Sequence, residues 1–188
     1  NHIQYDAVSY NAIRKANYEN FGSELIPDYD FSKAKTIVSF GADFLATWLF
    51  ATQFQHQYGH SRNPDKDWMS KHFQFESNHS ITGSNADYRA MIKPSEEQAV
   101  LEYILHSFDS SIAMPNLNGS IKTIADKAIN SLIETKNESL IVSGSNNKSI
   151  QLLVNKLNNR LSTYGTSIFT DNHIHLFKGD DKKTNDLI

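Results

Sequence analysis

Apolar residues follow two different spacings along this chain, one typical of buried strands and one typical of helices. Two short, mainly apolar runs predict strands buried on both faces: 35–40, which Gly41 follows, and 139–144, which ends in Gly144. Residues 72–76 and 88–92 are predicted as further extended segments. Apolar residues recur every three or four positions in the predicted helices, which are 9–20, 47–58, 94–108, 121–133 and 150–161.

The alternation of strands with helices predicts the fold class. It indicates an α/β protein with a Rossmann-like, mainly parallel sheet flanked by helices and joined by right-handed crossovers. Residues 110–119 show no periodicity and contain Pro115 and Gly119, so we place a boundary there. The prediction is a Rossmann-like lobe at 1–110 and a second α/β segment at 111–188 that can pack on the same sheet.

Local signals place the ends of these elements. Ser9 is predicted to cap the first helix and Gly22 to end it, while Thr47 is predicted to cap the second. Pro94, followed by two glutamates, is a strong helix start. The cluster at 82–85 is interpreted as a loop.

Composition narrows the function classes. Apolar residues make up 39% and charged residues 21% of the 188 residues, and the net charge is −3. No basic cluster indicates a nucleic-acid partner, and no apolar run reaches the ~20 residues that a direct membrane span needs. The chain contains no cysteine, which excludes thiolate-held iron–sulfur clusters from these residues. Since it begins at Asn1, we expect it to be a segment of a longer protein.

The ends of the two apolar strands are the candidate binding site, because open α/β sheets bind ligands beyond the carboxyl ends of their strands. Gly41 and Asp43 follow the first strand, and Gly144, Ser145 and Asn146 follow the second. Neither loop has the spacing of a dinucleotide or P-loop motif. Gly41 is therefore interpreted mainly as a turn residue. The polar groups of Ser143, Ser145, Asn146 and Asn147 can bind an anion at a helix N-terminus, but we interpret them mainly as a plain helix cap.

Other candidate chemistry is weaker. His56 and His60 have a spacing that suits a zinc pair, but no third ligand is recognisable, and we interpret them as surface histidines, so no metal site is predicted. His173 and His175 alternate onto one face of a possible strand. No G-x-S-x-G nucleophile elbow is present. Three carboxylates can converge near the strand ends and serve acid–base chemistry: Asp43, Glu76 and Asp87. The interpretation that we prefer is that they accept hydrogen bonds from loop amides and helix termini.

Three stretches of the sequence carry a resemblance to a known family. They are FSKAKTIVSFGADFLATW, MSKHFQFESNHSITGSNADYRAMIKPSEEQAVL and SLIVSGSNNKSIQLLVNKLNNRLSTYGTSI. Together they resemble the molybdopterin-oxidoreductase-like part of the large iron–sulfur subunit of bacterial alternative complex III, which transfers electrons from quinol to cytochrome c or an oxidase. The resemblance covers nearly the whole chain.

The resemblance implies a fold of the formate dehydrogenase and DMSO reductase type in a noncatalytic scaffold domain. It implies that the iron–sulfur clusters lie elsewhere in the full-length subunit. This segment is then expected to contain neither a cluster nor any other cofactor. The implied partners are other subunits of a respiratory complex, including haem-bearing and membrane subunits, at the periplasmic side of the membrane. The alternative is a domain of an active oxidoreductase that binds molybdopterin guanine dinucleotide at Gly41, Asp43, Gly144, Ser145 and Asn146.

Charge argues against that alternative. Where the family commonly has Gly-x-Asn at the first strand end, this chain has Gly41-Ala42-Asp43, and a carboxylate repels a diphosphate. Residues 76–78, Glu-Ser-Asn, lack the arginine of the family's Asp-Pro-Arg-like turn. We also expect three aromatic residues to fold inward and fill the former crevice: Phe44, Trp48 and Phe50. A small-molecule-binding module unrelated to redox work is the third possibility.

Overall fold

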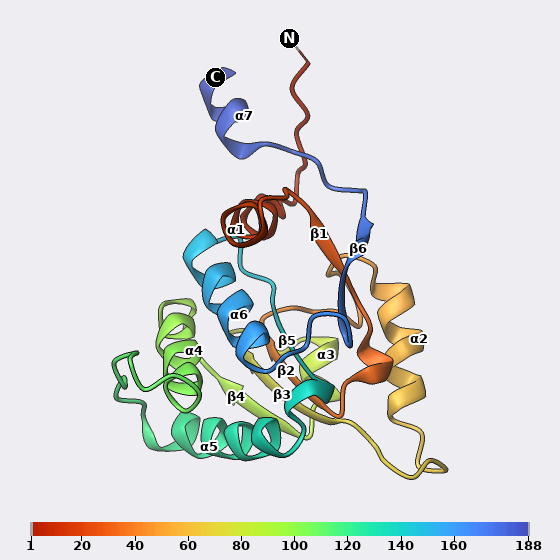
Figure 1. Ribbon diagram of the computed structural model, residues 1–188, viewed down its shortest axis with the longest axis vertical. Coiled ribbons are helices and arrows are strands. Elements are labelled where there is room, and N and C mark those ends of the chain that lie inside the picture. The colour runs from red at the N-terminus through yellow and green to blue at the C-terminus, as the bar shows by residue number, and fades with distance from the viewer. Residues whose placement is uncertain (1, 188) are drawn as a thin grey trace.

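Four parallel strands form the central sheet of the protein (Figure 1). The computed structural model describes residues 2–187. The strands are β2 (Thr36–Phe40), β3 (Lys71–Glu76), β4 (Tyr88–Met91) and β5 (Ser139–Ser143), and their order in the sheet is β4-β3-β2-β5. Every residue of β2 and β5 is buried, as their mainly apolar sequences predict. This sheet confirms the predicted α/β class and its Rossmann-like, parallel character.

Helices cover both faces of the sheet (Figure 1). One face carries α4 (Glu97–His106), α5 (Gly119–Glu134) and α6 (Lys148–Arg160). The other carries α2 (Ala51–Ser61) and an antiparallel ribbon of β1 (Ile26–Tyr29) and β6 (Ile168–Ile174). Helix α1 (Asn11–Phe21) packs beside α6. The short elements are α3 (Ile81–Ser84), α7 (Asp181–Leu187) and the 3-10 turns Phe31–Lys33, Pro94–Glu96 and Lys136–Glu138.

The sheet separates two apolar cores, because successive side chains of a strand point to opposite faces. Val38 and Phe40 enter the core beneath α4, α5 and α6, while Ile37 enters the core beneath α2. The second core is aromatic: the Phe31 and Phe44 rings are stacked with their centroids 4.2 Å apart. No helix within residues 2–187 is both long and apolar enough to cross a membrane.

The segment after residue 111 adds its strand to the same sheet as the first segment. β5 pairs in parallel with β2, and Val38 lies opposite Ile141. The 107–118 connection therefore joins two parts of one sheet.

Three of the predicted local features are wrong. Ser9 does not cap the first helix, because that helix begins at Asn11 with Tyr10 in the cap position and without a side-chain cap. The second helix begins at Ala51, and Thr47 does not cap it. The backbone oxygen of Asp43 instead accepts the N–H groups of Ala46, Thr47 and Trp48 at 2.9 to 3.0 Å, which makes a tight turn. Leu49 then takes a left-handed conformation with φ of 48°, so the chain cannot enter the helix before residue 51.

The cluster at 82–85, interpreted as a loop, lies mostly within α3. The Ser80 hydroxyl accepts the N–H of Gly83 and caps this short helix. The glycine and small polar residues of this cluster are typical of a loop. The sequence alone does not reveal the cap that makes them helical. The β1–β6 ribbon was not predicted either, since β1 contains Pro27 and its pairing is interrupted by a register shift.

Side chains seal the outer edge of β5. Asn158 of α6 accepts the N–H of Ile141 at 3.1 Å and donates to its carbonyl at 2.8 Å, so its amide imitates a neighbouring strand. Gln151 donates to the Ser143 carbonyl at 3.1 Å, and Ser167 donates to the Ser139 carbonyl at 2.6 Å. An open edge is a template for unwanted strand pairing, and this one is covered.

We expect Asn158→Ala to lower the free energy of unfolding by about 2–4 kcal/mol, since two buried backbone groups of Ile141 lose their partners. Urea unfolding followed by circular dichroism measures the change. Asn159→Ala, at an exposed neighbouring position, is the control and is expected to stay within about 0.5 kcal/mol of the unaltered protein. Equal stability of the two variants would show that the seal contributes nothing.

Candidate functional site

The carboxyl ends of β2 and β5 lie side by side at a topological switch point. The chain leaves β2 toward α2 on one face of the sheet, and it leaves β5 toward α6 on the opposite face. In open α/β sheets this arrangement separates the two loops and creates the usual ligand crevice. The predicted residues Gly41 and Asp43 on one loop, and Gly144, Ser145 and Asn146 on the other, are all brought to this edge.

The two loops touch here instead of separating. The N–H of Gly144 donates to the Phe40 carbonyl at 2.9 Å, and the N–H of Gly41 donates to the Phe75 carbonyl at 2.8 Å. A Cβ atom placed on Gly144 would lie only 2.6 Å from the carbonyl oxygen of Gly41. Gly41 itself has φ of 58°, a conformation that favours glycine. Gly144 is therefore needed for the direct packing of one loop on the other, and Gly41 for the left-handed turn that presents its carbonyl.

The polar groups of the β5 loop are used within the chain. Asn146 accepts the N–H of Ala12 at 3.0 Å, at the start of α1, and donates to the Asp181 carboxylate at 3.1 Å. The N–H of Ser145 donates to the Ser143 hydroxyl, and its carbonyl accepts from Gln151 at 2.7 Å. Asn147 caps α6 through the N–H of Ser149. The loop thus connects α1, α6 and α7.

The three predicted carboxylates each bind a different backbone amide. Asp43 accepts the N–H of Thr82 at 3.1 Å and its hydroxyl at 2.7 Å, which fixes the β2 loop to α3. Asp87 accepts the N–H of His72 at 2.7 Å and forms an ion pair with Arg62 at 2.6 Å. Asp43 and Glu76 thus bind amides at the start of α3, as the preferred interpretation predicts, whereas the amide that Asp87 binds belongs to strand β3.

Glu76 is the most completely bonded of the three. Its carboxylate accepts the Ser80 hydroxyl at 2.6 Å, the Ser80 N–H at 3.2 Å, Gln74 at 3.1 Å and the Arg89 Nε at 2.6 Å. Burial alone would raise the pKa of Glu76, but these hydrogen bonds outweigh it and lower the pKa. A Cβ on Gly83 would collide with this carboxylate. Glu76 therefore holds the start of α3 as an ionised structural group.

The expected aromatic side chains do fold inward, but as part of a larger core. Phe44 and Trp48 are buried, and Phe50 is half-buried against the same cluster. The Trp48 ring lies 5.3 Å from Tyr29 and 5.7 Å from Phe54, centroid to centroid. Its indole N–H has no hydrogen-bond partner in residues 2–187. These rings fill the layer between the sheet and α2.

The feature that the sequence did not reveal is a polar row on β3. His72, Gln74 and Glu76 alternate with Phe73 and Phe75, so they point to the α2 side of the sheet, and all three are buried. Burial lowers the pKa of His72 to about 4. The only available signal was the strict alternation, which normally indicates a solvent-facing side.

The remaining histidines form no cluster with further ligands. His56 and His60 are exposed on α2, and His60 lies 2.7 Å from the Lys66 ammonium. The His173 and His175 rings lie 4.3 Å apart, centroid to centroid, on and just beyond β6. Within residues 2–187 no group of three or more histidine, aspartate or glutamate side chains could hold a metal ion.

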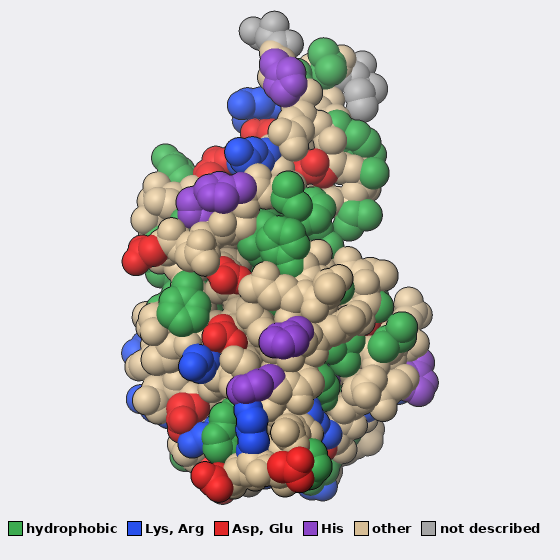
Figure 2. Space-filling model, turned by 90° about the vertical axis from the view of Figure 1, so that its right-hand side faces the viewer, with side chains coloured by type: hydrophobic (Ala, Val, Ile, Leu, Met, Phe, Trp, Pro, Cys, Tyr) green, Lys and Arg blue, Asp and Glu red, His purple; other side chains and the backbone are tan. Residues whose placement is uncertain are grey.

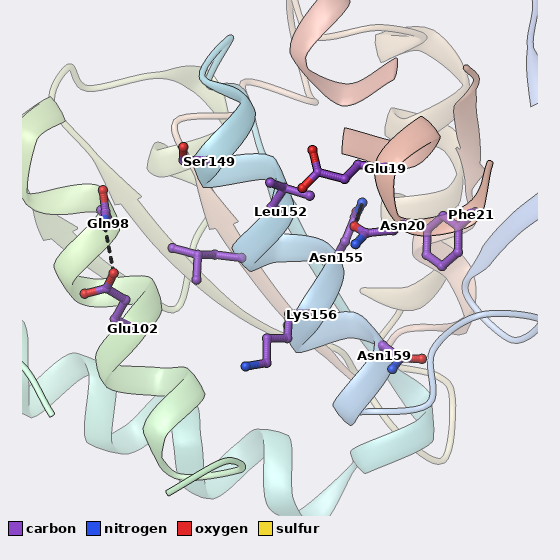
Figure 3. A pocket seen from close by; sticks show the side chains of 11 residues that line it. Glu19, Asn20, Phe21, Gln98, Glu102, Ser149, Leu152, Asn155, Lys156 and Asn159 are labelled. Carbon is purple, nitrogen blue, oxygen red and sulfur yellow. Dashed lines mark hydrogen bonds between the residues drawn. The ribbon is translucent and has the colours of Figure 1, made fainter. Parts of the chain in front are cut away.

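The two most voluminous of the surface hollows described lie away from the strand ends. One, of about 730 Å³, crosses α6 between the end of α1 and α4 (Figure 3). Its side chains largely pair with one another or with neighbours, as Gln98 with Glu102 at 2.7 Å and Glu19 with Lys148 at 2.6 Å. The other, of about 840 Å³, lies between residues 2–3 and 183–187.

No protein-family model and no curated protein matches this sequence.

We expect Gly144→Ala to lower the free energy of unfolding by about 1–3 kcal/mol, because the new methyl group collides with the Gly41 carbonyl. Thermal or urea unfolding measures the change. Gly119→Ala is the matched control: it has no atom within 4 Å of the added Cβ and lies at the start of α5. If Gly144→Ala were as stable as this control, the two loops would not be in contact.

We expect His72 to make the protein less stable as the pH falls from 6.5 toward 5. Its folded pKa is about 4 and its ordinary value 6.5, so in this range the unfolded chain binds the extra proton. The free energy of unfolding should fall by at most about 1.4 kcal/mol per pH unit from this group.

The measurement is the difference in unfolding free energy between the protein and its His72→Asn variant across this pH range, since contributions of other groups cancel in that difference. His56→Gln, at an exposed position, serves as the control and should leave the pH dependence unchanged. A pH-independent difference for His72→Asn would show that His72 is not buried in its neutral form.

Proposed function

We propose that this chain is a noncatalytic, molybdopterin-oxidoreductase-like scaffold domain of a membrane-associated, quinol-oxidising electron-transfer complex. The observation that supports it is the packing of Gly144 against the Gly41 carbonyl, which closes the switch point where a cofactor-bearing relative would bind its dinucleotide. The family assignment comes from the sequence resemblance, and the parallel four-stranded sheet is compatible with it.

The strand ends do not fit a molybdopterin guanine dinucleotide. A pyrophosphate needs free backbone N–H groups or cationic side chains at such a site. Here the N–H groups of Gly41, Gly144 and Ser145 already donate within the protein. Asp43 and Glu76 add negative charge at the same edge, and Arg89 is already paired with Glu76.

A scaffold role requires a fold that is complete without a ligand. The loops at the strand ends meet this condition, because their carboxylates and amides are bonded to α1, α3, α6 and α7. In this proposal the iron–sulfur clusters lie elsewhere in the full-length subunit, and the complex places the domain at the periplasmic side of the membrane.

Exposed apolar side chains supply a basis for contacts with haem-bearing or membrane subunits. Four large ones lie at the N-terminal end of the chain and on α1: Tyr5, Val8, Tyr18 and Phe21. Figure 2 shows apolar side chains gathered on one face below the projecting chain ends, while charged side chains of both signs are scattered over the rest of that face. Exposed apolar patches mark surfaces that bind other proteins.

The test is elemental and mass analysis of the purified full-length subunit and of this 188-residue chain. We expect neither molybdenum nor released pterin in either sample, and iron only in the full-length subunit. An active molybdopterin oxidoreductase purified in the same way controls for cofactor loss. Stoichiometric pterin bound to this chain would overturn the proposal and favour the cofactor-binding alternative.

A further inference from the structure

Four buried side chains form a continuous hydrogen-bonded row beneath α2. The Tyr58 hydroxyl lies 3.2 Å from His72 Nδ1, and His72 Nε2 lies 3.2 Å from Gln74 Oε1. Gln74 Nε2 then donates to Glu76 at 3.1 Å. His72 and Gln74 are fully buried, so each group in the row depends on its neighbours for hydrogen bonds.

The ionised end of the row fixes the position of the hydrogen on His72. The Glu76 carboxylate only accepts hydrogen bonds, so the Gln74 NH₂ group must face it and the Gln74 oxygen must face His72. That oxygen is also only an acceptor. His72 Nε2 therefore carries a hydrogen, and Nδ1 of the neutral ring has a free lone pair.

The Tyr58 hydroxyl has one hydrogen and two acceptors within reach. One is His72 Nδ1 at 3.2 Å, and the other is the Asn85 carbonyl at 3.0 Å. When His72 is neutral, its Nδ1 needs the hydroxyl hydrogen. When His72 is protonated, Nδ1–H donates to the hydroxyl oxygen, and the hydroxyl hydrogen is released to Asn85.

The charged groups around His72 come from three elements. Asp87, at the start of β4, and Glu76, on β3 itself, favour a positive charge on the ring, while Arg62, at the end of α2, opposes it. The Phe44 ring lies 5.3 Å from the imidazole, centroid to centroid, and supplies no charge. Burial is the largest influence and keeps the ring neutral near pH 7. Burial also raises the pKa of Tyr58 to about 12, so its hydroxyl keeps its hydrogen.

We propose that Tyr58 and His72 form a proton-operated switch in which protonation of His72 moves the hydroxyl hydrogen of Tyr58 from His72 Nδ1 to the Asn85 carbonyl. Asn85 ends α3 and leads into β4, whereas Tyr58 lies on α2. The acid form thus commits the hydroxyl hydrogen to the bond between α2 and the α3–β4 connection, whereas in the neutral form His72 Nδ1 competes for it. This inference does not depend on the proposed function.

Nitrogen and carbon NMR of the isotope-labelled 188-residue chain tests the switch. Near pH 7 the His72 nitrogen shifts should be those of the tautomer with hydrogen on Nε2. On acidification, the carbonyl carbon of Asn85 should shift with the same midpoint as His72, near pH 4.

Two variants separate the switch from a general effect of acid. In Tyr58→Phe, the His72-linked shift of Asn85 should disappear while His72 still titrates. Tyr164→Phe removes a partly buried hydroxyl, which donates to Asn155, and should leave the Asn85 shift intact. Hydrogen on Nδ1 near pH 7, an Asn85 shift unlinked to His72, or unfolding before His72 titrates would each overturn the proposal.

Discussion

The contact between Gly144 and the Gly41 carbonyl is the constraint on which the strand-end region depends. Two neighbouring parallel strands send their chains to opposite faces of the sheet, and this topology ordinarily leaves a gap. Here the loops close the gap by packing backbone on backbone, which only residues without a Cβ permit at this distance. Once the loops meet, their remaining polar groups must find partners among the flanking helices, and α1, α3, α6 and α7 supply them.

The same logic explains why the carboxylates at this edge are structural. A general acid or base needs a group that can donate or accept a proton and that faces a substrate. Glu76 instead accepts four hydrogen bonds from Ser80, Gln74 and Arg89, which leaves it saturated and ionised. Asp43 is committed to Thr82 in a similar way. The Asp43 and Glu76 carboxylates would repel a phosphate ligand at this edge. Here they bind the four-residue helix α3 and hold it against the sheet.

The sequence was informative where local pattern and burial agree. β2 and β5 could be predicted because strands buried on both faces are mainly apolar, and Gly22 predicted the end of α1 because glycine tolerates its left-handed φ of 74°. The polar row on β3 could not be predicted, since its alternation has the pattern of a solvent-facing strand, and only the packing of α2 buries it. Thr47 failed as a helix cap because the turn on the Asp43 oxygen and the left-handed Leu49 delay the start of α2 to Ala51.

The buried polar row also determines the register of β3 in the sheet. Phe73 and Phe75 enter one core, and His72, Gln74 and Glu76 face the other side. A slip of one residue would exchange these sets and leave three polar groups in an apolar core without partners, at a cost of about 1–3 kcal/mol for each unsatisfied group. An all-apolar strand would carry no such penalty. Because a correct register is also what aligns Glu76 with Ser80 and Arg89, the polar row connects the specificity of the sheet to the geometry of its carboxyl edge.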